Sequence, residues 1–138
     1  MTQHVRETVA EAVENNHLGE TITLWFDGSC EPVNPGGVAT CGWLIRDHAG
    51  ELLASGKREV CRGPKATNNV AEWSALGFGL RWLLDNPQHS RDRVLKIKGD
   101  SKLVIEQLNG TWKCNAEHLQ KLRDRCQQIL RELDRVVW

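Results

Sequence analysis

Two hydrophobic periodicities follow one another along this chain, and their order limits the folds that it can adopt. Three successive segments have the alternating or β-branched composition of strands before the first helical pattern begins. After that point, helical patterns alternate with short strand patterns. Consecutive strands favour an antiparallel meander, whereas strands separated by helices favour parallel additions to the same sheet. The order therefore predicts an α/β domain with a mixed sheet flanked by helices.

Turn-forming residues divide these patterns into eight expected elements. Strands are expected at residues 21–26, 40–46, 51–60, 93–98 and 134–138, and helices at 69–84, 101–108 and from 115 onward. Thr67 and Asn68 are suitable N-caps for the first helix, and Asn115 for the last. The last helix carries an apolar stripe formed by Leu119, Leu122, Cys126, Ile129 and Leu133.

Length and composition indicate one domain, with a polar extension at residues 1–20 and the main body at residues 21–138. Eighteen basic and eighteen acidic residues give zero net charge, which argues against tight, purely electrostatic binding to nucleic acid. The five cysteines are scattered without a C-x-x-C pair, which disfavours a zinc site or a disulfide framework. No apolar run reaches membrane-spanning length and no secretory signal is evident, so a cytoplasmic protein is expected.

Three carboxylates are notable for their positions. Asp27 ends an apolar strand pattern, Glu72 lies one turn into the first helix, and Asp100 follows the strand expected at 93–98. Ligands in open α/β sheets gather beyond the carboxyl ends of strands. If the three converge, their hard oxygen atoms suit Mg²⁺ or Mn²⁺. Separate structural roles are the alternative, because aspartate is common in turns and glutamate in a first helical turn complements the helix dipole.

Three short sequence motifs favour a shared metal site over separate structural roles for these carboxylates. The segment Trp25 to Gly37, WFDGSCEPVNPGG, resembles the first-strand motif of type 1 ribonucleases H. The segment Thr67 to Glu72, TNNVAE, resembles their second motif, and Lys98 to Val104, KGDSKLV, resembles the third. The motifs stand in family order with family-like separations. The resemblance covers residues 21–138. The turn Glu31 to Gly37 and the region Leu108 to Asn115 resemble the compact, archaeal-like branch, which lacks the basic handle helix of longer members.

This resemblance implies a mixed five-stranded sheet and endonucleolytic hydrolysis of the RNA strand in an RNA–DNA hybrid. It implies that Asp27, Glu72 and Asp100 bind two Mg²⁺ or Mn²⁺ ions and are catalytic. The residues that match the family's substrate-binding positions are Gly28, Ser29, Cys30, Asn34, Asn68 and Asn69. Amide side chains suit the 2′-hydroxyls displayed in an RNA minor groove. No protein partner is evident, and a monomer is expected with a dimer as the alternative.

One departure from the family pattern concerns the two ends of the chain. The family carries a fourth acid in a helix after its last strand, and no such helix follows Trp138. Val5, Val9 and Val13 form a helical stripe in the extension, so one hypothesis is that residues 1–20 replace that helix, with Glu11 or Glu7 as the fourth carboxylate. An acidic extension without this role is the simpler alternative. If the metal site is incomplete, the expected function is a hybrid-binding module of weak or no activity.

Aromatic and basic residues give a second set of substrate candidates. Trp43, Trp73 and Trp82 lie within expected elements, where core packing is expected. Trp112 follows a glycine in a loop and is a candidate for substrate contact, because aromatic rings stack on bases. A set of basic residues is expected either to contact phosphate or to form a solvated helix face: Lys113, Lys121, Arg123, Arg125 and Arg131.

Overall fold

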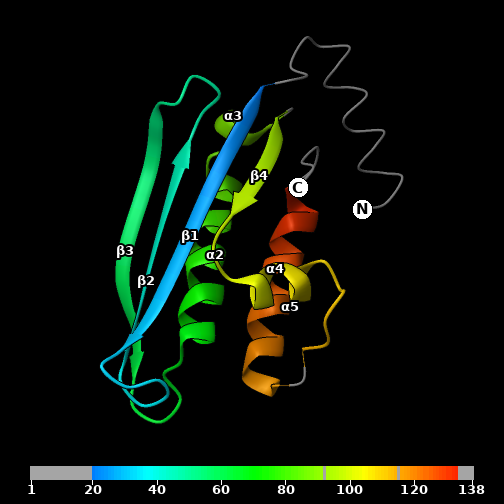
Figure 1. Cartoon of the computed structure of the whole chain (residues 1–138). Helices are drawn as coiled ribbons and strands as arrows, with labels where there is room; N and C mark the ends of the chain where they lie inside the picture. Colours follow the sequence, from blue (N-terminus) through cyan, green and yellow to red (C-terminus); the bar gives the residue numbers. More distant parts are fainter. Residues whose placement is uncertain (1–19, 92, 115, 134–138) are drawn as a thin grey trace.

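The computed structural model describes residues 20–91, 93–114 and 116–133. The elements, labelled as in Figure 1, are β1 Thr21–Glu31, β2 Val38–Arg46, β3 Leu52–Arg62, α2 Asn68–Asp85, α3 Pro87–Ser90, β4 Val94–Lys98, α4 Lys102–Leu108 and α5 Glu117–Glu132. Up to the last helix their order is the one expected from the sequence, with one addition. The residues Asn86 and Pro87, expected only to end the long helix, instead lead into the single turn of α3.

Four strands form one sheet in the order β3-β2-β1-β4 (Figure 1). The β1–β2 and β2–β3 pairs are antiparallel, and β4 pairs with β1 in parallel. The predicted meander followed by a parallel addition is therefore confirmed. The sequence predicts five strands, whereas the described part of the chain contains four. The fifth was expected at residues 134–138, which lie outside the described residues.

The hydrophobic core lies between the sheet and α2. In β1 the alternate residues Ile22, Leu24 and Phe26 are buried, and they pack in one cluster with the buried face of α2. Trp73 of α2 is fully buried, and its indole N–H donates a hydrogen bond of 3.2 Å to Oε1 of buried Gln107. The period-two pattern thus places one face of β1 against α2 and leaves the opposite face uncovered by this helix.

Helix α5 lies beside α2, and α4 lies next to α5 (Figure 1). The predicted stripe is confirmed, because four of its five residues are buried in the core and Leu122 is partly buried against it. The predicted cap at Asn115 lies outside the described residues. Ala116 occupies the N-cap position of α5 without a side-chain hydrogen bond.

The hypothesis that residues 1–20 replace a C-terminal helix falls almost wholly on residues 1–19, outside the described part of the chain. It therefore stays a prediction, together with the roles of Glu7 and Glu11. No helix in the described ranges has the length and apolar character needed to cross a membrane.

Candidate active site

The first strand is longer than its sequence pattern indicates. It was expected to end at Phe26, but β1 continues to Glu31 because its antiparallel pairing with β2 persists from Asp27 opposite Gly42 to Glu31 opposite Val38. The prediction that Asp27 lies at a strand end is therefore wrong for β1 itself. Asp27 does, however, lie just beyond the end of the parallel pairing of β1 with β4, because that pairing ends at Trp25 and Lys98.

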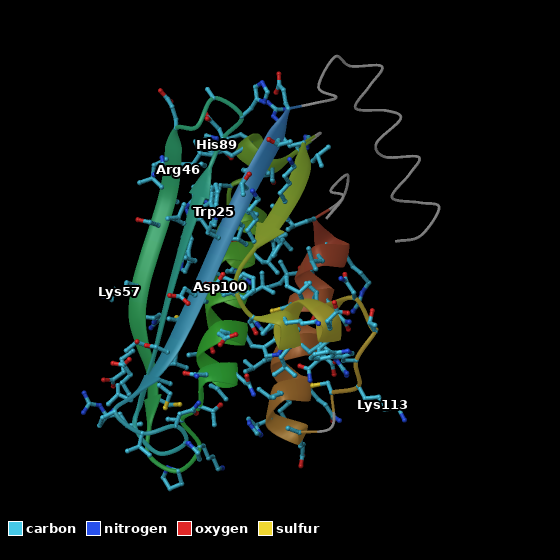
Figure 2. The ribbon with its side chains drawn as sticks, viewed as in Figure 1. Trp25, Arg46, Lys57, His89, Asp100 and Lys113 are labelled. Atoms are coloured by element: carbon cyan, nitrogen blue, oxygen red, sulfur yellow. The ribbon has the colours of Figure 1, made fainter. Side chains whose placement is uncertain are left out.

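Asp27 and Asp100 occupy equivalent positions on these two parallel neighbours. Each lies two residues beyond the last pair, Trp25 and Lys98. Figure 2 shows Asp100 just past the end of β4 and next to β1. Both aspartates are exposed. The carboxyl end of the parallel pair thus carries two carboxylates at the same level, as the sequence argument requires.

Gly28 brings the third carboxylate to this edge. A Cβ atom at Gly28 would lie 2.5 Å from the carbonyl carbon of Ala71 and 2.7 Å from its Cβ, and also against the amide nitrogen of Glu72. Real Cβ atoms do not approach other atoms so closely. The missing side chain therefore lets the first turn of α2 touch β1 one residue after Asp27. This contact fixes the position of Glu72 relative to Asp27.

Glu72 is half-buried, and its Oε2 atom is fully buried without a hydrogen-bond partner among the described residues. Burial raises the pKa of this carboxyl, and the charges of Asp27 and Asp100 raise it further, whereas a hydrogen bond from the Ser101 hydroxyl lowers it. Glu72 is thus close enough to Asp27 and to Asp100 to interact electrostatically with each. An unpaired buried carboxylate oxygen is costly unless a cation or donor reaches it.

The substrate candidates near β1 already have contacts within the protein. The hydroxyls of Ser29 and Thr40 lie 2.9 Å apart across β1 and β2. Cys30 is buried, and its thiol lies 3.1 Å from the carbonyl oxygen of Val33 and 3.2 Å from that of Ala66. These contacts hold the loop after β1 against the segment that leads into α2. Contact of Gly28, Ser29 and Cys30 with substrate stays a prediction.

The asparagines lie together at the N-terminus of α2. The backbone N–H of Asn68 donates to Oδ1 of Asn34 at 3.2 Å, and the N–H of Val70 donates to Oγ1 of Thr67 at 3.1 Å. Thr67 is therefore the N-cap, as expected, and Asn68 is the first helical residue rather than a cap. Within the described residues the side chains of Asn68 and Asn69 make no hydrogen bond, so both amides are available to a ligand.

An open cleft runs over the sheet beside the acids. Its lining includes Trp25, Asp27 and Asp100, together with Lys57 of β3 and Lys98 of β4. Figure 2 labels Trp25, Lys57 and Asp100. The Nζ atom of Lys98 lies 5.8 Å from the centre of the Trp25 ring. The sequence argument did not identify Lys57, Lys98 or Trp25 as site residues. For Trp25 and Lys98, alternation with buried residues of β1 and β4 is the signal that places them on this face. Strand β3 has no buried residue, so no such signal marks Lys57.

The remaining tryptophans divide into core residues and one exposed residue, as expected from the sequence. Trp73 is core, and Trp43 and Trp82 are partly buried against it. Trp112 is 42% exposed, and the Nζ atom of Lys102 lies 5.7 Å from its ring centre. This exposed ring thus lies beside the side chain of a lysine that is two residues after Asp100. Its contact with substrate stays a prediction.

Similarity to known proteins assigns the family. The sequence model of a family described as reverse transcriptase-like matches residues 25–138. The crystal structure of ribonuclease H1 from Halobacterium salinarum superposes with a TM-score of 0.70 and 32% sequence identity, over 83% of this chain and 80% of that one. The chain belongs to the ribonuclease H family.

A sequence comparison with the Halobacterium salinarum enzyme and one further solved structure add to this similarity. The ribonuclease HI of Halobacterium salinarum is 34% identical over 123 residues, which are 89% of this chain but 57% of the archaeal protein. The chain therefore spans little more than half of that relative. A ribonuclease H1 isolated from compost, LC11, was solved in complex with an RNA/DNA hybrid. It has a TM-score of 0.73 and 26% identity, over 85% of this chain and 82% of that one.

The donor set fits a hard divalent cation. The acids provide only oxygen donors, and buried Oε2 of Glu72 lacks a partner that a cation would supply. In the described ranges, however, no three His, Cys, Asp or Glu side chains stand close enough to enclose an ion unaided. Magnesium usually keeps several of its waters and binds through one or two carboxylates. The arrangement is thus compatible with a partly hydrated ion.

Removal of the Glu72 charge is expected to stabilise the metal-free protein at neutral pH. The raised pKa means that the folded state binds more protons than the unfolded state between the ordinary and the raised value. Wild-type stability therefore falls as pH rises through this window, and Glu72→Gln lacks this loss. Urea unfolding in chelator at a series of pH values measures the effect.

The advantage of Glu72→Gln should disappear as the pH falls below the ordinary value of a glutamate. Glu132→Gln, which changes an exposed acid on α5, is the matched control and should show no such pH-dependent difference. An advantage of Glu72→Gln that stays constant across the series would contradict the prediction.

Proposed function

We propose that the chain is a metal-dependent endonuclease that hydrolyses the RNA strand of RNA–DNA hybrids. One observation carries the proposal: half-buried Glu72, with its unpartnered Oε2, lies within the electrostatic reach of Asp27 and Asp100. The hybrid bound by the LC11 relative supports this choice of substrate. The cytoplasmic location and the monomeric state expected from the sequence stay predictions.

In this proposal Asp27, Glu72 and Asp100 hold Mg²⁺ or Mn²⁺, with two ions expected. Bound divalent ions generate a water nucleophile and neutralise the charge that develops on the phosphate. The chain itself supplies the remaining functions. Lys57 and Lys98 place positive charge on the rim of the cleft, where phosphates approach. The Asn68 and Asn69 amides at the start of α2 can both donate to and accept from 2′-hydroxyls.

An alternative function is a hybrid-binding module without cleavage. The observation that favours it is the lack of three described side chains close enough to enclose an ion. Incubation of the full chain with an end-labelled hybrid, in Mg²⁺ or Mn²⁺, separates the two functions. Metal-dependent cleavage of the RNA strand supports the nuclease. Retardation of the hybrid in a gel without cleavage supports the module and contradicts the nuclease.

We expect the chain to select hybrids over duplex DNA through the two asparagines. Asn69→Ala should lower kcat/KM on the hybrid about three- to tenfold, the cost of about one hydrogen bond. Its effect on any cleavage of an all-DNA duplex should be smaller, because DNA lacks the 2′-hydroxyl. Gln128→Ala, an exposed amide on α5, is the control. Equal losses on both substrates would show that Asn69 does not read the 2′-hydroxyl.

A further inference from the structure

Gly42 lies on the floor of the cleft beside the acids. In the sheet register it is directly opposite Asp27 of β1 on one side and Lys57 of β3 on the other, and directly opposite residues point to the same face. The guanidinium carbon of the next residue, Arg58, lies 4.6 Å from the ring centre of Phe78 on α2, so Lys57 points to the face opposite α2. A carboxylate and an ammonium group thus line the cleft on either side of a residue without a side chain.

Neither the backbone nor the packing of the described residues requires glycine at this position. A Cβ atom on Gly42 would lie 3.7 Å from the carbonyl oxygen of Gly56, an ordinary van der Waals distance, and would meet no other described atom within 4 Å. Its φ angle lies outside the left-handed region that favours glycine, and the register shifts of β2 fall elsewhere, at residues 39–40 and 45–46. Glycine weakens a strand, and where no bulge or bend explains it, it often marks the close approach of a ligand.

The cleft has the size and the charge to hold part of a phosphate backbone. Its volume is about 660 Å³, within the range of ligand pockets. Neighbouring strands lie about 4.8 Å apart, so the Cα atoms of Asp27 and Lys57, two strands apart, are separated by ~10 Å. The exposed ammonium of Lys57 has no carboxylate partner among the described residues. It therefore offers an unpaired positive charge across an open floor from the acids.

We propose that Lys57 binds the backbone phosphate next to the one held at the acids, and that Gly42 keeps the floor between the two phosphates open; this subsite rests on the proposed function. Each nucleotide carries one negative charge, and lysine binds phosphate as a point charge. Phosphate contacts fix the register of a nucleic acid on a protein without reading its sequence. The competing explanation is that Lys57 only protects the edge strand β3 from pairing with another chain.

The role of the lysine is tested by anisotropy of a fluorescein-labelled hybrid, titrated with the full chain in chelator over a series of salt concentrations. Lys57→Met should weaken binding about tenfold at low salt, the effect of one charged contact, and should reduce the slope of log affinity against log salt by about one. Lys57→Arg retains the charge and should stay near wild type. The loss should be equal on duplex DNA, because no 2′-hydroxyl is involved.

Lys96→Met is the matched control for the lysine. Lys96 is an exposed lysine of β4, and its register position opposite Thr23 places it on the same face of the sheet as Lys98 but outside the lining of the cleft. Its loss should leave the salt slope unchanged. If Lys96→Met and Lys57→Met weaken binding equally, the effect is one of general charge and the subsite is overturned.

Gly42→Ala and Gly42→Val test the floor without removing any charge. Affinity for the hybrid should fall with side-chain size, by about tenfold in the valine variant, because the added methyl groups occupy the path of the backbone. The free energy of unfolding should stay the same or rise, since both residues suit a strand better than glycine. A loss of stability in both variants would show that protein packs on the floor, and would overturn the role of Gly42.

The subsite and the proposed function fail in different ways. If the wild type cleaves the hybrid but Lys57→Met and Gly42→Val bind it with wild-type affinity, the subsite is overturned and the nuclease stands. If binding depends on both residues but no cleavage follows in Mg²⁺ or Mn²⁺, the subsite is supported and the nuclease is contradicted. An effect of only one of the two variants overturns the role assigned to the other residue, and a wild type that neither binds nor cleaves the hybrid overturns both proposals.

Discussion

Asp27→Asn, Glu72→Gln and Asp100→Asn are each expected to reduce hybrid cleavage by about a thousandfold or more. Metal ions supply several kcal/mol of transition-state stabilisation, and each ~1.4 kcal/mol corresponds to a factor of ten in rate. An amide of the same shape keeps the packing but removes the negative charge that attracts the cation. Single-turnover cleavage of a labelled hybrid under saturating Mg²⁺ and Mn²⁺ measures the loss.

The variants should lose activity without losing structure. Asp27 and Asp100 are exposed, so their amides should leave the free energy of unfolding nearly unchanged, and Glu72→Gln removes a partly desolvated charge. Glu132→Gln on α5 provides an exposed acid of the same type whose loss should not affect cleavage. Near-normal cleavage by any one of the three variants would remove that residue from the site.

The segment Gly28-Ser29-Cys30 shows that a local sequence pattern can misplace the end of a strand. It has the small, polar composition of a loop, so the first strand was expected to end before it. In the structure this segment is strand, because each of its residues pairs with β2 and Cys30 is buried against Ala66. Long-range pairing here overrides local propensity, a common outcome for strands. The strand's start and its parallel neighbour could be read from the sequence.

The candidate site was predictable only in part, because some of its contacts also depend on long-range packing. Asp27, Glu72 and Asp100 could be chosen by position and family resemblance, and Glu72 lies within electrostatic reach of both aspartates. Their role as the site stays a prediction. Ser101 was expected only to begin a helix. The effect of its hydroxyl on the pKa of Glu72 depends on how α2 packs against the loop after β4, which no local pattern records. The cap that Asn34 gives to Asn68 likewise joins residues 34 positions apart.

Gly28→Ala is expected to destabilise the protein by about 1–3 kcal/mol, the usual cost of overpacking a close contact. The added Cβ would meet backbone atoms of Ala71 and Glu72, which cannot rotate away as a side chain can. Relief requires α2 to move from β1, and Glu72 would move with it away from Asp27. Cleavage should therefore fall by more than the fraction of unfolded protein explains. Urea unfolding and hybrid cleavage, measured on the same preparation, give both quantities.

Gly77→Ala is the matched control for this prediction. It adds the same methyl group to α2, but there the new Cβ would lie 3.6 Å from Sγ of Cys126, an ordinary van der Waals distance. Because alanine favours a helix interior over glycine by about 1 kcal/mol, this variant should be more stable than wild type and cleave normally. If Gly28→Ala matched it in stability and cleavage, the contact between β1 and the first turn of α2 would not be what positions Glu72. A stable but inactive Gly28→Ala would instead show that the contact matters for the placement of the acids more than for the fold.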